Sequence, residues 1–267
     1  MSIPTISSAK TIEQYFLTGE EPVLVMCSDL NMYVCKYMRS SASAYKLACE
    51  LIGAEMAKIW KFYSPNIALV KIKPSHWNGV CLNHYNNAPA LGGKWMDGVI
   101  DITPSTYDKI PTTNDVFYQL IKIALFDFWV ANEDRNANNA NLMFDVIKEQ
   151  LVVIDFGCIF NTATFDYPLS QLTITDTILY SDIFIHLRQG ANKTSITNLL
   201  KQLKKEYSLF IKQCIFSISE IEKEIPQEWN VPHDIIKEKF EQLFNRKWIA
   251  EVWNNFFECL NDNLNYE

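Results

Sequence analysis

The most informative part of the chain consists of NEDRNANNANLMF, residues 132–144, and VVIDFG, residues 152–157. It starts with a polar segment, continues into a short apolar run, and reaches a charged turn at residues 148–149. A second apolar run then leads to Asp155. Two short apolar runs joined by a polar turn are typical of a β-hairpin. These residues therefore predict a polar loop followed by a hairpin that places Asp155 at the end of a strand.

Three polar residues of this part have a spacing that suits phosphoryl transfer. Asp134 and Asn139 are five residues apart in the loop, and Asp155 follows sixteen residues after Asn139. A protein that transfers phosphate must orient a hydroxyl group, hold magnesium against the phosphates and neutralise the charge of the transferred group. A loop aspartate can position the hydroxyl, while an asparagine and a second aspartate supply the hard oxygen ligands that magnesium favours. The spacing predicts a kinase active site.

The first hundred residues have a pattern that predicts strands interrupted by a single helix. Ser40, Ser41 and Ser43 offer N-caps for a helix over about residues 44–62, where apolar side chains recur with helical spacing. The expected strands lie at residues 22–27, 32–37, 66–72 and 98–102. The first two are separated by a polar turn, which is again a hairpin pattern.

The residues after Pro111 have a helical composition, apart from the central hairpin. Asn114 or Asp115 can cap a helix that ends at about Ala131. Beyond the hairpin we expect irregular chain as far as Thr194, where a long amphipathic helix begins. Two further helices are expected at residues 232–244 and 246–260.

These patterns predict a two-lobed α+β fold of the protein-kinase type. The N-lobe, residues 1–104, is rich in strands, and the C-lobe, residues 105–267, is mainly helical. No stretch is long or biased enough in composition to serve as a flexible linker. The two lobes are therefore expected to pack closely, with ATP and Mg²⁺ bound between them.

The two central motifs resemble the catalytic loop and the metal-binding segment of HipA-like kinases, and phosphatidylinositol kinases share a similar pattern. Upstream, VLVMCSDLNMYVCKY, residues 23–37, is similar to the family's segment with the phosphate-binding lysine, here Lys36. Glu50 lies in YKLACELIGAEMAKIW, residues 45–60, which is similar to the helix that carries the carboxylate partner of that lysine. The sequence IPQEW, residues 225–229, extends the resemblance over nearly the whole chain.

The resemblance implies a stand-alone kinase that transfers phosphate from ATP, with Mg²⁺, to Ser or Thr hydroxyls of a protein, itself included among the candidate substrates. A Lys36–Glu50 pair would hold the ammonium group where it can touch the α and β phosphates. The family's small DNA-binding antitoxins make an antitoxin-like protein partner a further expectation. The catalytic residues implied are Asp134, Lys36 and Glu50. The nucleotide-binding residues implied are Lys36, Gly19, Asn139 and Asp155, of which Asn139 and Asp155 hold the metal.

The sequence departs from ordinary eukaryotic protein kinases at three places, one of which is the lack of an APE element after Asp155. Asn132 and Glu133 precede Asp134 where most protein kinases have His and Arg, and no GxGxxG motif precedes Lys36. In its place stands TGEE, residues 18–21, with Gly19 as the residue expected to approach the phosphates. The two glutamates of this loop suit a triphosphate only if they point away from it.

A calcium-binding loop of the EF-hand type is the alternative from a different class. Asp134, Asn136 and Asn138 fall at its first, third and fifth ligand positions. However, position six holds Asn139 where the sharp turn needs glycine, and a hairpin is expected where an EF-hand has a helix. A phosphoinositide lipid kinase and a nucleotidyl transferase stay open as alternatives on the kinase-like fold. The presence of Lys36, Asp134, Asn139 and Asp155 together argues against a pseudokinase that only binds nucleotide.

The composition argues against several other classes of protein. A chain of 267 residues with 48% hydrophobic composition can bury a substantial core, which excludes disorder as its default state. The 24 basic residues against 31 acidic ones argue against binding to nucleic acid or an anionic membrane. The seven cysteines form no CxxC pair, so neither a disulfide scaffold nor structural zinc is expected. Without the pattern of a signal peptide or a membrane span, the protein is expected to be cytoplasmic.

Overall fold

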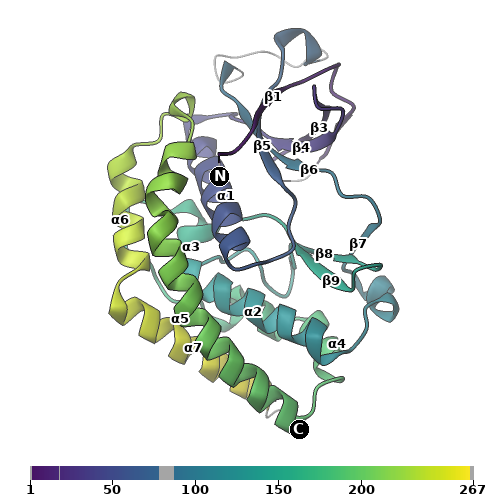
Figure 1. Ribbon diagram of the computed structural model, residues 1–267, viewed down its shortest axis with the longest axis vertical. Helices are drawn as coiled ribbons and strands as arrows, with labels where there is room; N and C mark the ends of the chain where they lie inside the picture. Colours follow the sequence, from purple (N-terminus) through teal and green to yellow (C-terminus); the bar gives the residue numbers. More distant parts are fainter. Residues whose placement is uncertain (1, 18, 78–86, 265–267) are drawn as a thin grey trace.

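The computed structural model describes residues 2–17, 19–77 and 87–264, which form two sheets and a set of helices (Figure 1). The larger sheet consists of β1 (Thr5–Ser7), β2 (Gln14–Tyr15), β3 (Val23–Met26), β4 (Met32–Lys36), β5 (Ile67–Lys71) and β6 (Ala90–Lys94). Its order is β1-β5-β6-β4-β3-β2, with β1 parallel to β5 and the other neighbours antiparallel. The smaller, antiparallel sheet has the order β7-β8-β9, from β7 (Val99–Asp101), β8 (Leu142–Asp145) and β9 (Gln150–Val153).

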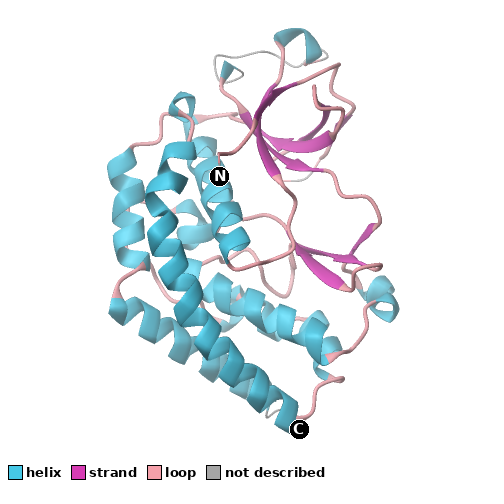
Figure 2. Cartoon of the chain, in the orientation of Figure 1, coloured by secondary structure: helices cyan, strands magenta, loops and turns pink. Residues whose placement is uncertain are grey.

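The helices lie on one side of the two sheets, as the colours of Figure 2 show. They are α1 (Ser41–Ile59), α2 (Asn114–Val130), α3 (Ile159–Ala163), α4 (Asp182–Arg188), α5 (Lys193–Glu224), α6 (His233–Leu243) and α7 (Arg246–Leu264). Short 3₁₀ turns are η1 (Pro74–His76), η3 (Pro104–Lys109), η4 (Ile174–Asp176), η5 (Ile178–Tyr180) and η6 (Gln227–Trp229). The chain passes from the larger to the smaller sheet between Lys94 and Val99. The lobe boundary at residues 104 and 105 stays a prediction.

The predicted hairpin of β3 and β4 is confirmed, and its alternation orients Lys36. Tyr33 and Cys35 are buried in a small core on one face of the larger sheet. Because successive side chains of a strand point to opposite faces, Val34 and Lys36 point to the other face. Both residues line a cavity between the sheets.

The N-terminal ends of α1 and α2 are fixed by side-chain caps. At α1, the Ser40 hydroxyl accepts a hydrogen bond from Ser43 N, and the Ser43 hydroxyl accepts one from Ser40 N. This reciprocal capping box satisfies backbone donors that the first helical turn leaves unpaired. At α2, the prediction of Asn114 or Asp115 as cap is wrong, because Thr113 accepts the hydrogen bond from Val116 N.

Two further parts of the sequence-based prediction are wrong. The region expected to be irregular before Thr194 contains α4, whose seven residues are too short to show helical periodicity, and α3, a five-residue turn with left-handed φ values at residues 160–163. Strand β6, with the sequence ALGGK, has two glycines and lacks the residues typical of strands. It forms because β4 and β5 pair with it on both sides, and a Cβ at Gly92 would lie 2.8 Å from Val70 Cγ2.

The main hydrophobic core joins α1 to the helices that follow the sheets. Trp60, the C-cap of α1, packs against Trp129 of α2 and Phe210 of α5, with ring centroids 5.6 and 5.3 Å apart. Helix α1 makes its most extensive helix contacts with α3 and α5 (Figure 1). Although α1 lies between two strands in sequence, it belongs to the helical part in packing.

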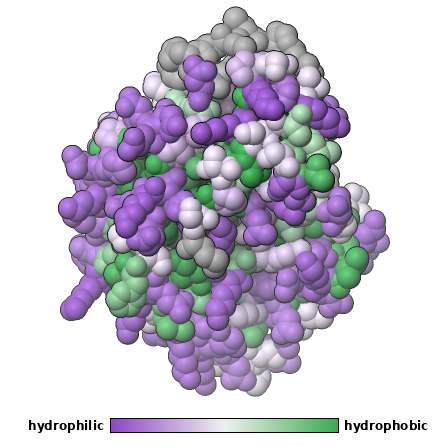
Figure 3. Space-filling view, turned by 45° about the horizontal axis from the view of Figure 1, so that its top comes forward, coloured by the Kyte–Doolittle hydropathy of each residue, from purple (hydrophilic) through white to green (hydrophobic). Residues whose placement is uncertain are grey.

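The surface of the molecule is mainly polar. On the face drawn in Figure 3, hydrophilic side chains predominate and hydrophobic ones form small areas between them. Among the helices that the structure describes, none combines the length and the apolar character that crossing a bilayer requires.

Candidate active site

A cavity of about 760 Å³ lies between the two sheets. Its walls are largely apolar, with Phe16 and Val34 on the side of the larger sheet and Met143 and Val153 on the side of the smaller one. Residues 95–98, which connect the two sheets, line it as well. Its polar lining includes Lys36, Glu50 and Asp155, all expected site residues. An apolar cavity with a few convergent charged groups is the usual form of a small-molecule site.

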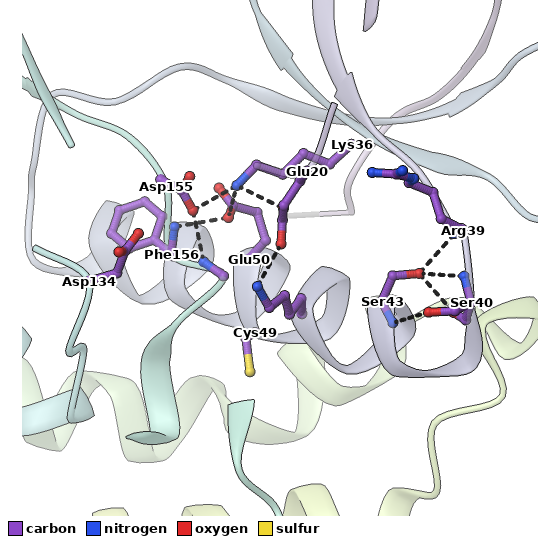
Figure 4. A network of polar contacts seen from close by, with 12 residues as sticks. Glu20, Lys36, Arg39, Ser40, Ser43, Cys49, Glu50, Asp134, Asp155 and Phe156 are labelled. Carbon is purple, nitrogen blue, oxygen red and sulfur yellow. Dashed lines mark hydrogen bonds and ion pairs between the residues drawn. The ribbon is translucent and has the colours of Figure 1, made fainter. Parts of the chain in front are cut away.

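Lys36 is the centre of an ion-pair network in this cavity (Figure 4). Its Nζ lies 2.8 Å from Glu50 Oε2 and 2.7 Å from Asp155 Oδ1. The predicted pair between Lys36 and Glu50 is therefore present. The three residues come from β4, from the middle of α1 and from the segment after β9, so the network connects parts that are 119 residues apart along the chain.

The charges of this network shift one another's pKa values. Burial lowers the pKa of Lys36, but Glu50 and Asp155 outweigh it and hold that pKa above the ordinary lysine value. Burial raises the pKa of Glu50 to about 7, although Lys36 opposes the shift. At Asp155 burial again favours the neutral form, yet Lys36 prevails and the pKa lies below the ordinary value. Lys36 and Asp155 are therefore charged at neutral pH, whereas Glu50 titrates near it.

The backbone around Asp155 fixes the position of its carboxylate. Asp155 has a φ of 59°, in the left-handed region, and its Oδ1 accepts a hydrogen bond from Gly157 N at 3.3 Å. Phe156 N donates to Glu50 Oε2 at 2.9 Å. The Phe156 ring packs on α1 at Gly53, where a Cβ would come within 2.4 Å of Phe156 Cβ. Gly53 is thus a residue that sequence reasoning missed, and its only signal is a glycine inside a helical pattern.

The loop before β8 orients Asp134 through two amide side chains. Asp134 Oδ2 accepts hydrogen bonds from Asn139 Nδ2 at 3.1 Å and from Asn141 Nδ2 at 2.9 Å. The structure therefore brings Asp134 and Asn139 together. Asn141, which has a φ of 45°, is a further member that the sequence did not single out. Figure 4 shows Asp134 in the same region as Asp155 and Phe156.

A buried arginine ties this loop to the segment that carries Asp155. Arg135 is fully buried, and its Nε lies 2.9 Å from Asp127 Oδ2 at the end of α2. Its other nitrogens donate to the backbone oxygens of Ile154 at 3.0 Å and Asp155 at 3.3 Å, and to that of Asn141. Burial raises the pKa of Asp127 to about 6, although Arg135 opposes the shift. Sequence reasoning missed this pair, because one partner lies in an apolar helix.

Glu133 stabilises the turn at residues 160–163, which follows Asp155 in the chain. Its carboxylate accepts hydrogen bonds from Asn161 Nδ2 at 2.8 Å and from Thr162 Oγ1 at 2.7 Å. Residues 160–163 all have positive φ values, which cost L-amino acids about 1–2 kcal/mol each. The contacts with Glu133 help to offset that cost, and they link the loop of Asp134 to the segment after Asp155.

The predicted role of Gly19 at the phosphates stays a prediction. The space around a Cβ at Gly19 is open, with nothing within 4 Å. The next residue, Glu20, instead reaches Lys36, with Oε2 3.5 Å from its Nζ. Glu21 turns away from the cavity and pairs with Arg39 at 2.9 Å. One glutamate of the loop thus points toward the expected phosphate position and the other does not.

The donor atoms present fit a magnesium ion bound together with a nucleotide. Within residues 2–17, 19–77 and 87–264, no three side chains from His, Cys, Asp and Glu gather as a metal cluster. Mg²⁺ in nucleotide sites needs no such cage, because water and phosphate oxygens supply most of its ligands. The Asp155 carboxylate is one hard donor. Asn139 offers a second, since its Nδ2 is used by Asp134 and its Oδ1 is the remaining amide atom.

Two solved kinases align with nearly the whole chain. CtkA, a Helicobacter pylori proinflammatory kinase, aligns with a TM-score of 0.51 at 14% identity, covering 96% of this chain and 99% of its own. A Golgi casein kinase with Mn/ADP bound aligns with a TM-score of 0.48 at 11% identity, covering 98% of this chain and 74% of its own. No curated protein matches the sequence. The chain has a two-lobed α+β kinase-like fold, as predicted.

A family model described as HipA-like kinase matches residues 12–257. The match includes Lys36, Glu50, the loop of Asp134 and the hairpin that leads to Asp155. It confirms the resemblance stated from the sequence and assigns the protein to the kinase-type phosphotransferases. The chain belongs to the HipA-like kinase family.

Proposed function

We propose that the protein transfers the γ-phosphoryl group of ATP, in the presence of Mg²⁺, to Ser or Thr hydroxyls of a protein. One observation carries this proposal: Lys36 is held by Glu50 and Asp155 in a cavity with apolar walls. Such a cavity suits a purine, and the fixed ammonium group suits the α and β phosphates.

Each part of the cavity has a proposed task. The adenine ring lies between Val34 and Met143, with the main chain of residues 95–97 beside it. Lys36 binds phosphate, and Glu50 positions Lys36 without contacting the nucleotide. Asp155 and Asn139 would hold Mg²⁺, which supplies charge neutralisation on the phosphates when it is bound.

Asp134 is the proposed catalytic residue for the acceptor. Its carboxylate, oriented by Asn139 and Asn141, binds the hydroxyl group of the substrate. The bond between the hydroxyl oxygen and the γ-phosphorus forms as the bond to the β,γ-bridging oxygen breaks, and the hydroxyl proton passes to Asp134. Because the transition state is loose, orientation matters more than basicity, and the proton moves late.

The resemblance to HipA-like kinases is our reason to propose a protein acceptor rather than an inositol lipid. The net charge of −7 supports this preference, since an anionic membrane attracts basic surfaces. The antitoxin-like partner and the cytoplasmic location stay predictions.

Intact-mass spectrometry after incubation with ATP and Mg²⁺ tests the proposed function. We expect a dephosphorylated casein acceptor, or the protein itself, to gain phosphate on Ser or Thr. The matched control is Asp155→Asn, in which no phosphate should appear. A mass gain of AMP would favour a nucleotidyl transferase, phosphate on phosphoinositide vesicles alone would favour a lipid kinase, and no transfer to any acceptor would contradict the proposal.

A further inference from the structure

The Glu20 carboxylate lies between two lysines, Lys36, labelled in Figure 4, and Lys46. Its Oε2 is 3.5 Å from Lys36 Nζ, and its Oε1 is 3.2 Å from Lys46 Nζ. Lys46 stands on α1 four residues before Glu50, so both side chains lie on the same side of the helix. A carboxylate that bridges two ammonium groups occupies a position that fits another small oxyanion.

The charges around Lys36 do not balance while Glu20 is there. Glu20, Glu50 and Asp155 surround one ammonium group, and Lys46 supplies only a second positive charge. The three carboxylates are close together, because oxygens of all three lie 3.4–3.9 Å from a Cβ placed on Gly157. A polyanion entering this space would meet a net negative charge. If Glu20 withdraws, two lysines face two carboxylates, and the barrier to an anion falls.

Glu20 is the member of this group that is able to leave. It belongs to the turn before β3, whereas Glu50 sits in the middle of α1 and Asp155 is held by Gly157 N. Its side chain is about one-third exposed, at 30%. Lys46 has a side-chain exposure of 39% and stays beside the cleft when Glu20 moves, because α1 is packed in the main core.

We propose that Lys36 and Lys46 form a two-lysine subsite for a phosphate group of the nucleotide, and that Glu20 occupies this subsite until the nucleotide displaces it. The inference rests on the proposed function, which it deepens by adding Lys46 as a phosphate-binding residue. Glu20, a residue of the chain itself, thus competes with the nucleotide for this subsite.

Calorimetry with three probes tests the proposal at a fixed Mg²⁺ concentration: ATP, inorganic pyrophosphate and adenosine. For Glu20→Gln we expect ATP and pyrophosphate to bind about three- to fivefold more tightly, the effect of one partly exposed ion pair, and adenosine to bind unchanged. Glu21→Gln is the matched control, since it makes the same charge change on the neighbouring residue that faces Arg39. It should leave all three affinities unchanged.

A second variant separates direct contact from general repulsion. In the Glu20→Gln background, Lys46→Gln should weaken pyrophosphate binding about three- to fivefold, because the subsite then keeps one lysine. The proposal is overturned if Glu21→Gln acts like Glu20→Gln, if adenosine affinity rises equally, or if Lys46→Gln has no effect on pyrophosphate. The thermal midpoint of each variant serves as the folding control.

The outcomes also distinguish this proposal from the proposed function. If pyrophosphate responds to the variants as expected but adenosine does not bind and ATP binds no better than pyrophosphate, the subsite stands and the ATP-dependent function fails. If ATP and adenosine bind but Glu20→Gln leaves pyrophosphate binding unchanged, the function stands and the subsite fails.

Discussion

Asp155 shows how one backbone conformation determines which substitution gives an interpretable test. Its φ of 59° lies in a region that Asp and Asn tolerate better than Ala. Asp155→Asn keeps the size and the backbone preference, and it removes only the charge. Asp155→Ala would add backbone strain to the loss of the carboxylate.

We expect Asp155→Asn to abolish Mg²⁺-dependent phosphoryl transfer, because the carboxylate is the proposed charged metal ligand. The thermal midpoint should change by less than about 4 °C. Transfer measured with radiolabelled ATP, together with a thermal scan, checks both statements. Transfer at the parental rate would remove Asp155 from the site.

Asp134→Asn is expected to lower the transfer rate by about 10² to 10⁴, the usual effect of losing a positioned acid or base. ATP affinity should change little, since Asp134 contacts the acceptor rather than the nucleotide in the proposed site. Single-turnover kinetics and calorimetry on the same variant give the two numbers. A parallel loss of both would make Asp134 a metal ligand or a residue needed for the fold.

The raised pKa of Glu50 predicts that phosphoryl transfer depends on pH. Its pKa of about 7, raised by burial, means that the carboxyl gains a proton as the pH falls from 8 to 6. The neutral form holds Lys36 less firmly, so transfer should rise with pH through a midpoint near 7. The stability contribution has the opposite sign, because a raised acid pKa favours the folded state below about pH 4.5 and this benefit is lost as the pH rises through 7.

The pH–rate profile of the parental protein and of Glu50→Gln checks this prediction. The variant should transfer more slowly and lose the rise near pH 7. An unchanged profile in Glu50→Gln would assign the titration to another group.

At the scale of elements, Arg135 connects three of them: the end of α2, the loop of Asp134 and the segment after β9. Removing one partner of a buried ion pair destabilises the fold much more than replacing both, because the remaining charge stays in the interior without compensation. Asp127 and Arg135 therefore form a unit that positions the site without touching the proposed substrates.

Arg135→Met should lower the free energy of unfolding by about 3–5 kcal/mol, since it leaves Asp127 buried without its partner. Replacing both residues, as Asp127→Leu with Arg135→Met, should recover part of that loss. Urea unfolding of the single and double variants measures the two effects. Equal losses in both would show that packing, rather than the unpaired charge, sets the cost.

Elements with strong local patterns could be predicted from the sequence. The apolar runs around polar turns indicated both hairpins, and helical spacing indicated α1 and α2. Strand β6 could not be predicted, because it depends on β4 and β5, which lie elsewhere in the sequence. At the site, the resemblance to HipA-like kinases implied the pair of Lys36 and Glu50, whereas the contact of Lys36 with Asp155 was not predicted. The direction of Glu20 and the partner of Arg135 depend on tertiary packing and have no local signal.

At the scale of the whole molecule, α1 and the hairpin of β3 and β4 pack in different cores, although Ile67 of β5 and Leu91 of β6 belong to the main core. The side chains of α1 belong to the main core, with Trp60 against α2 and α5, while β3 and β4 contribute to a separate small core. Further contacts join the C-terminal part to the sheet side, since Trp229 Nε1 donates to Pro89 O at 2.8 Å and Ile3 N donates to Glu224 Oε2 at 2.8 Å.

Native-state hydrogen exchange should report this division. Amides of α1 are expected to exchange together with those of α2 and α5, and more slowly than those of β3 and β4, because local opening follows cooperative packing units. Mass spectrometry of peptides after deuterium labelling measures the rates. Exchange of α1 in step with β3 and β4 would contradict the division.

The position of α1 in the main core has a consequence for any opening and closing of the cleft. Lys36 lies on β4, which contributes to the small core, whereas Glu50 lies on α1 in the main core, where Phe156, next to Asp155, packs too. A movement of β4 relative to α1 is then the motion that would separate the lysine from both carboxylates. In such a motion, closing the cavity would bring Lys36 back to its ion pairs, so the distance from β4 to α1 would report how far the cavity has closed.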